Sequence, residues 1–145
     1  MAWSYIADAR VAKVYYLVMT EFDKNAIPTK LLWVDLEMTG LDSDKDVILE
    51  VAAEVTDFNF KTLGSYEARI RQKREVVVER MQKNIWWRDY PANREDFLNN
   101  LDKAKPQSEV EQELIAFVAK NFGEEPAILA GNSIHNDRIF IKQWL

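Results

Sequence analysis

The stretch LLWVDLEMTGLD, Leu31–Asp42, joins a buried strand to two closely spaced acids. Its first four residues are apolar, which is typical of a strand covered on both faces. Asp35 and Glu37 follow with one residue between them, and side chains alternate along a strand, so both carboxylates should point the same way. Two like charges at the end of a buried strand repel each other and lose hydration. The pattern therefore predicts that another group compensates them.

The composition predicts a single globular domain and excludes several kinds of site. A chain of 145 residues, 48% of them hydrophobic, should bury about 70% of its unfolded surface. It has no cysteine, which excludes disulfides, thiolate metal sites and a cysteine nucleophile, and is compatible with a reducing cytoplasm. The formal net charge of −5 argues against a broad basic surface for nucleic acid. A small anionic substrate held through bound cations is compatible with that charge.

Residues 1–18 are distinct from the polar lead MTEFDKNAIPTK, which begins at Met19. Asp8, Arg10 and Lys13 interrupt their apolar residues, unlike a secretory signal, and the segment is too short and charged to span a bilayer. We expect residues 1–18 to be an appendage, such as an upstream start, or an additional amphipathic helix. Residues 19–145 form the expected domain.

Three neighbouring segments have the residue types and alternation of strands. They are residues 31–37, residues 47–58 (VILEVAAEVTDF) and residues 65–72 (SYEARIRQ), with NFKTLG as a turn between the last two. Short links between consecutive strands predict an antiparallel meander.

Helical spacing begins after Arg74. The stretch EVVVERMQKNIWWRDY predicts one helix over residues 75–90, whose buried face carries Val77, Met81 and Ile85. Pro91 can begin a second, short helix. Its inward residues should be Phe97, Leu98 and Leu101.

A further helix should follow Pro106, where Ser108 and Glu111 have the spacing of a capping box. Gly123 supplies its stop. Its apolar stripe consists of Val110, Leu114, Phe117, Val118 and Phe122. PAILAGN (126–132) then predicts a short buried strand, and SIHNDRIFIKQWL (133–145) a last helix. Together these elements predict a mixed α/β domain.

Asp137 lies just inside the last helix, beyond a strand end where α/β sheets commonly bind ligands. Asp35, Glu37 and Asp137 would repel strongly if they met there without a cation. Mg²⁺ and Mn²⁺ prefer such oxygen ligands. Two ions could bind a phosphodiester, activate water and stabilise the leaving oxygen. We therefore predict that divalent metal compensates the acids.

Three other signals have simpler interpretations. Asp42–Asp46 has the spacing that starts an EF-hand loop, but Val47 stands where glycine is required, so we expect a solvated turn. Of Trp86 and Trp87, one should be in the core, leaving at most one for substrate. His135 is the only histidine, and a lone histidine is more often an ordinary polar residue than a catalyst.

With LLWVDLEMTGLD and GNSIHND together, the sequence resembles the oligoribonuclease family. That family belongs to the DEDDh group of 3′→5′ exonucleases, which have a ribonuclease H-like α/β fold. VILEVAAEVTDFNFKTLG is similar to the family's second and third strands. The resemblance covers about residues 31–145, less clearly through the two tryptophans, and excludes the N-terminal appendage.

The resemblance implies roles for individual residues. The metal-binding and catalytic carboxylates would be Asp35, Glu37 and Asp137. The substrate-binding residues would be Met38 and Thr39 beside the 3′-terminal nucleotide, Leu41 as a wedge between bases, and Ser133 near the phosphate. The implied activity is two-metal (Mg²⁺ or Mn²⁺) hydrolysis of very short RNA, especially dinucleotides, by a cytoplasmic homodimer.

The sequence departs from the family at its C-terminus. The family continues with an aromatic-basic segment, a general-base histidine and a fourth aspartate, whereas this sequence stops at IKQWL. We therefore expect an incomplete domain that lacks the family's final helical region, has impaired activity, and leaves Ile141, Trp144 and Leu145 uncovered. His135 lies in a different motif and is not expected to act as the base. The alternative is a non-catalytic protein that binds short oligonucleotides.

Overall fold

The computed structural model describes residues 27–145, and the appendage expected at residues 1–18 lies outside the described residues. The elements in chain order are β1 (Lys30–Met38), β2 (Ile48–Asp57), β3 (Thr62–Arg71), α2 (Arg74–Lys83), α3 (Ile85–Asp89), α4 (Pro91–Asn100), a 3₁₀ turn (Leu101–Lys103), β4 (Lys105–Pro106), α5 (Gln107–Phe122), β5 (Ile128–Ala130) and α6 (Ile134–Trp144).

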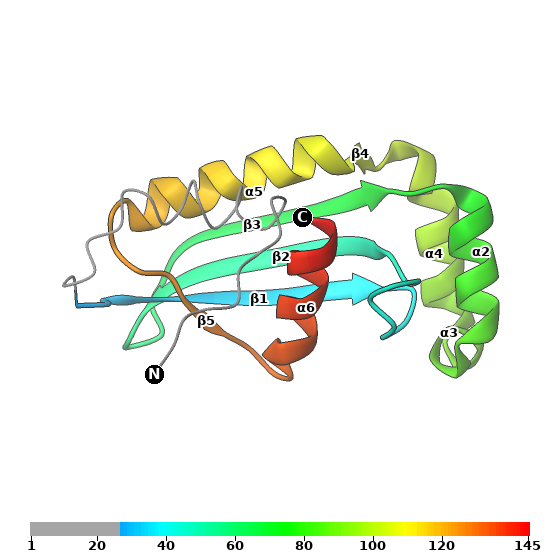
Figure 1. Cartoon of the computed structure of the whole chain (residues 1–145), viewed down its shortest axis with the longest axis horizontal. Coiled ribbons are helices and arrows are strands. Elements are labelled where there is room, and N and C mark those ends of the chain that lie inside the picture. Colours follow the sequence, from blue (N-terminus) through cyan, green and yellow to red (C-terminus); the bar gives the residue numbers. More distant parts are fainter. Residues whose placement is uncertain (1–26) are drawn as a thin grey trace.

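A five-stranded sheet with the order β4-β3-β2-β1-β5 forms the centre of the molecule (Figure 1). The pairs β1–β2 and β2–β3 are antiparallel, so the predicted meander is confirmed. β5 pairs in parallel with β1, but only along Leu31–Trp33 of β1. The two-residue strand β4, which was not predicted, pairs in parallel with the end of β3. The predicted mixed α/β class is confirmed.

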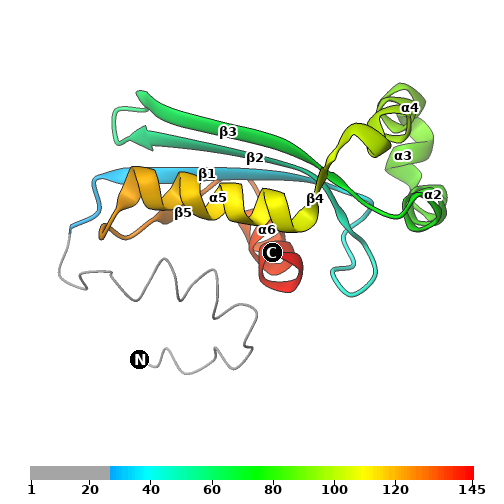
Figure 2. The same ribbon diagram turned by 90° about the horizontal axis from the view of Figure 1, so that it is seen from above.

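α5 and α6 lie on the same face of the sheet, which we call the covered face (Figure 2). Alternation along the strands directs apolar side chains toward these helices. The strands contribute to this main core Leu32, Val34, Leu36, Ile48, Val51, Ala53, Val55, Ala68 and Ile70. The apolar stripe predicted on α5 packs against them, and Phe140 and Leu145 contribute from the C-terminal segment. This core holds β1 in place beneath the candidate site.

A second, smaller core joins α2, α3 and α4 to the beginning of β2. Its buried members are Val47, Leu49, Val77, Met81, Trp87, Phe97 and Leu101. These helices stand at the end of the sheet where β1 finishes (Figures 1 and 2). Residues 27–145 therefore contain two apolar clusters, one under the sheet and one at its end.

The single helix predicted over residues 75–90 is wrong, because the chain breaks at Asn84. This residue has extended backbone angles, φ −104° and ψ 124°. Its side chain accepts a hydrogen bond from the backbone N–H of Trp86 and thereby starts α3. Val77 and Met81 are buried as predicted, but Ile85 is 64% exposed since the break turns it away from that face.

The predicted capping box before α5 is also wrong. Pro106 is the N-cap residue, and no side chain makes a capping hydrogen bond there. The other end is as predicted: Gly123 follows the helix with φ +55°, and its N–H donates to the carbonyl of Ala119.

The last helix is not left uncovered. Leu145 is buried, and Ile141 and Trp144 pack against the main core. The Trp144 indole also donates to the carbonyl of Ser43 at 2.9 Å. Across residues 27–145, none of the helices has the length and apolar character needed to cross a membrane.

Candidate active site

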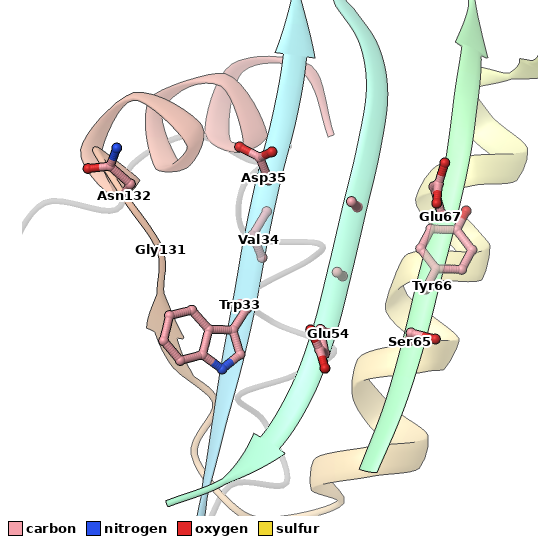
Figure 3. Close-up of a pocket in the computed structure, with 11 residues that line it drawn as sticks. Trp33, Val34, Asp35, Glu54, Ser65, Tyr66, Glu67, Gly131 and Asn132 are labelled. Atoms are coloured by element: carbon pink, nitrogen blue, oxygen red, sulfur yellow. The ribbon is translucent and has the colours of Figure 1, made fainter. Parts of the chain in front are cut away.

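The face of the sheet opposite α5 and α6, which we call the open face, is predominantly polar. Cross-strand partners place three rows of side chains there: Trp33, Glu54 and Ser65; Asp35, Ala52 and Glu67; and Glu37, Glu50 and Arg69. A hollow of about 370 Å³ extends over the first two rows (Figure 3). Gly131 and Asn132, at the end of β5, form its side next to β1 (Figure 3).

Asp35 and Glu37 lie on the open face near the end of β1, where they alternate with core residues Val34 and Leu36 that point the other way. Burial raises the pKa of Glu37, and the negative charges of Asp35 and Glu50 raise it further. The pairing of β1 with β2 shifts register between Glu37 and Met38, so the regular strand ends directly after the second acid. The repulsion inferred from the Asp-x-Glu spacing is therefore present in the folded chain.

Asp137 reaches the edge of β1 from the first turn of α6. Its carboxylate accepts a hydrogen bond from the backbone N–H of Leu36 at 3.1 Å, beyond the last residue of β1 that pairs with β5. Only 5% of the residue is exposed. Burial raises the pKa of Asp137, and the nearby charge of Asp35 adds to the effect. The fold thus brings the third predicted acid to the strand that carries the other two.

The donor chemistry of these acids fits a hard divalent ion, because all the ligand atoms are carboxylate oxygens and the charge of Asp35 adds to the burial that raises the pKa of Glu37 and of Asp137. The three acids are not gathered around a single point. Within residues 27–145, no three acids or histidines come close enough together to hold one ion. Asp137 is instead turned onto the backbone of β1.

The loop after β1 is fixed by a buried acid. Asp46 is 3% exposed and accepts hydrogen bonds from Arg80 at 2.8 Å, the Thr39 hydroxyl at 3.0 Å and the Asp42 N–H at 2.9 Å. Burial alone would raise the pKa of Asp46, but these donors outweigh it and hold the pKa below its ordinary value. The prediction of a solvated turn over Asp42–Asp46 is therefore wrong at Asp46. A side chain at Gly40 would collide with this carboxylate, so the loop requires glycine there.

Thr39 and Met38 hold the loop against α3. The Thr39 side chain is fully buried, and its hydroxyl also accepts from the N–H of Val47. The carbonyl of Thr39 accepts from the Asn84 amide and from the indole of Trp87, which also reaches the carbonyl of Met38. The polar groups of Thr39 are thus used within the protein, where they fix the loop's shape.

Beside this loop, several large apolar side chains are exposed. Leu41, two residues after Thr39, is 71% exposed. Trp87 is 1% exposed and Trp86 40%, so the prediction that one of the pair belongs to the core is confirmed. The rings of Trp86 and Tyr90 lie 4.8 Å apart between centroids, and Tyr90 is also exposed. Leu41, Trp86 and Tyr90 are therefore available for contact with flat apolar groups such as bases.

A family model described as Exonuclease (RNase_T) matches residues 32–144, which include the two acids of β1, the fixed loop and Asp137. The chain belongs to this exonuclease family. The match lies within residues 19–145, the span expected for the domain.

The relatives that this chain matches include oligoribonucleases. The chain is 32% identical over 119 residues to oligoribonuclease of Chromobacterium violaceum. This alignment covers 79% of this chain and 62% of that protein. It is 35% identical to that of Corynebacterium glutamicum, with 88% and 60% covered. For Corynebacterium efficiens the identity is 38%, with 80% and 52% covered. The chain therefore spans about 60% or less of the length of these relatives.

Among solved structures, an Exonuclease I from Methylocaldum szegediense aligns over 77% of this chain and 22% of its own length. The TM-score is 0.48 and the sequence identity is 18%.

The remaining predicted site residue lies at the start of α6. Ser133 is exposed and precedes the helix with φ +55°, so the chain turns sharply there. His135 is also exposed. Ser133 and Asp137 lie on the same short segment as Asn132, which borders the hollow next to β1. Contact of Ser133 with phosphate stays a prediction.

Sequence reasoning missed two charged residues on the open face in the row that contains Glu37. Glu50 lies directly opposite Glu37, and Arg69 lies opposite Glu50. Together with Asn93 and Asp96 of α4, they line a second hollow of about 350 Å³ beside Glu37. Only the strand register reveals these neighbours, because alternation alone gives the face of each residue and not its partner.

Proposed function

We propose that the chain is a divalent-metal-dependent 3′→5′ exoribonuclease domain that hydrolyses very short RNA. The observation that carries the proposal is the placement of Asp35 and Glu37 on the open face, with Asp137 at the same strand's edge, in a chain of the exonuclease family. Relatives named oligoribonuclease support short RNA as the substrate.

Asp35, Glu37 and Asp137 would hold the ions. Mg²⁺ or Mn²⁺ bound there would polarise the phosphodiester and make water a better nucleophile at neutral pH. The protein's own contribution is to fix the acids: β1 is anchored by its apolar side chains on one face, and by Asp137 at its edge. Burial raises the pKa of Glu37 and of Asp137, and the charge of Asp35 raises both further. A bound cation would offset the charge of Asp35 as a proton does.

The substrate's bases would pack against exposed apolar residues beside the acids. Leu41 projects from a loop that Asp46 and Arg80 hold in place, so it can separate bases without first being ordered. Met38 and Thr39 would position the backbone beside the 3′-terminal nucleotide, and Ser133 would approach the phosphate. We further propose, from the family resemblance, that the enzyme acts as a homodimer in the cytoplasm.

A non-catalytic protein that binds short oligonucleotides is the second candidate. It is favoured by the absence, within residues 27–145, of three acids gathered around one point. Both candidates predict that Leu41 contributes to binding, and only the first predicts turnover.

The test is release of mononucleotide from a labelled diribonucleotide with Mg²⁺ or Mn²⁺, alongside measured binding of the same ligand. We expect turnover that Asp35→Ala abolishes and Asp44→Ala, on the exposed part of the loop, preserves. Leu41→Ala should weaken binding by about 1–3 kcal/mol if it packs on a base. Phe58→Ala is its control, because Phe58 is an exposed apolar residue on the β2–β3 turn. Binding without turnover would establish the second candidate, and absence of both would exclude the two together.

A further inference from the structure

Arg69 connects the open face of the sheet to α4. Its Nε donates to the Glu50 carboxylate at 2.7 Å, and a terminal nitrogen donates to Asp96 at 2.7 Å. Its guanidinium lies 4.5 Å from the centre of the Phe97 ring. A guanidinium held by two carboxylates and an aromatic ring has little freedom to reorient. Arg69 is therefore a fixed positive charge in an otherwise acidic row.

Glu50 would be a competing ligand without that partner. It is the direct cross-strand neighbour of Glu37 on the same face. Opposite side chains on antiparallel strands lie about 4.5–5.5 Å apart at their Cβ atoms, which is close enough for two carboxylates to share one cation. A cation shared by Glu37 and Glu50 would be drawn across the sheet, away from Asp35 and Asp137. Glu37 belongs both to this pair and to the pair with Asp35, so a cation bound by one pair competes with a cation bound by the other.

We propose that Arg69 is a positioning residue of this site: by occupying the Glu50 carboxylate, it keeps Glu50 out of the ion-binding set and leaves Glu37 to act with Asp35. This inference rests on the proposed function, since it assumes that Asp35 and Glu37 bind divalent ions. Arg69 need not touch substrate, because it acts through Glu50 on the place where the cation binds.

Arg69 has a second structural role that must be separated from the first. Its contacts with Asp96 and Phe97 fasten α4 to the sheet beside Glu37. If this fastening were its whole contribution, loss of the Asp96 contact would reproduce loss of Arg69. The two roles therefore predict different Mn²⁺ affinities for Asp96→Asn. They also predict different affinities when Glu50→Gln is added to Arg69→Gln.

The experiment measures Mn²⁺ binding to the metal-free chain by titration calorimetry, with thermal unfolding as a check of folding. We expect Arg69→Gln to bind Mn²⁺ roughly three- to tenfold more tightly, because it removes a nearby positive charge and frees a carboxylate. Its hydrolysis of a diribonucleotide should nevertheless fall by up to about 100-fold, because the ion is displaced from the reacting geometry. Adding Glu50→Gln should bring both values back to within about threefold of wild type. Asp96→Asn should leave Mn²⁺ affinity close to that of wild type.

Unchanged or weaker Mn²⁺ binding by Arg69→Gln would overturn the proposal. So would failure of Glu50→Gln to reverse the effect, or an equal effect from Asp96→Asn. Mn²⁺ binding without hydrolysis in the wild type would refute the proposed catalysis, whereas the comparison of Mn²⁺ affinities would still decide the role of Arg69. No Mn²⁺ binding by the wild type would refute both.

Discussion

The two faces of strand β1 differ in what they contribute to the molecule. Leu32, Val34 and Leu36 point into the main core, whereas Asp35 and Glu37 point to the open face. Both sets lie on one continuous strand, where alternate residues point to opposite faces. Burial on one face thus supplies the rigidity with which the acids on the other are held, despite their mutual repulsion.

The largest effect should come from the covered face. Leu36→Ala removes a buried side chain and should lower the free energy of unfolding by about 2–5 kcal/mol, because the apolar contacts are lost and a cavity is left. Asp35→Asn, the adjacent change on the open face, should cost less than about 0.5 kcal/mol or raise stability, since it relieves repulsion. Urea denaturation of both variants without metal gives the comparison. Equal losses of unfolding free energy in the two variants would mean that the covered face does not contribute more to stability than the open face.

An intermediate effect is expected at the strand's edge. Asp137→Ala leaves the N–H of Leu36 without its partner and should lower the free energy of unfolding by about 1–3 kcal/mol. Asp137→Asn keeps an oxygen that can accept this hydrogen bond and should retain most of the stability, while losing the negative charge needed for a cation. Chemical denaturation and Mn²⁺ titration of both variants test this. If the asparagine variant were as unstable as the alanine variant, the hydrogen bond from the Leu36 N–H would not account for the contribution of Asp137 to the free energy of unfolding.

The smallest effect concerns the pH dependence of stability. Burial, with Asp35 and Glu50, raises the pKa of Glu37 above its ordinary value of 4.5. The native chain therefore keeps this proton over a pH range in which the unfolded chain has lost it. Stability is lost as the pH rises from the ordinary pKa through the raised one. Glu37→Gln should remove that loss and should be more stable, relative to wild type, at neutral pH than below pH 4.5.

The measurement for Glu37 is denaturation across this pH range in a chelating buffer. Glu124→Gln is the matched control, because Glu124 is an exposed glutamate in the turn after α5. A constant difference between Glu37→Gln and wild type at all pH values would show that Glu37 has no raised pKa in the native chain.

Much of the fold follows from local patterns. Alternation identified β1, β2 and β3, and the apolar stripe with Gly123 identified α5. The break at Asn84 was missed because it depends on a tertiary contact, the hydrogen bond from its amide to the carbonyl of Thr39. Strand β4 was missed since two residues carry no periodicity.

The candidate site could be predicted in part for the same reason. The shared face of Asp35 and Glu37 follows from their spacing alone. The burial of Asp46 does not, because its partner Arg80 lies 34 residues away on α2. Likewise, the neighbours of Glu37 across the sheet depend on register, which an amphipathic pattern does not define when the open face is polar in all three strands.

The division of the apolar residues into two clusters implies unequal local stability. Helices α2, α3 and α4 depend on the smaller cluster, to which Leu49 of β2 and the preceding Val47 also belong. Such a unit can open transiently while the sheet and α5 stay folded, so its amide protons should exchange with solvent at a lower free energy than those of β1 and β2. Trp144 packs against both clusters. It therefore connects α6, which carries Asp137, to the unit whose opening would also release the loop that bears Leu41.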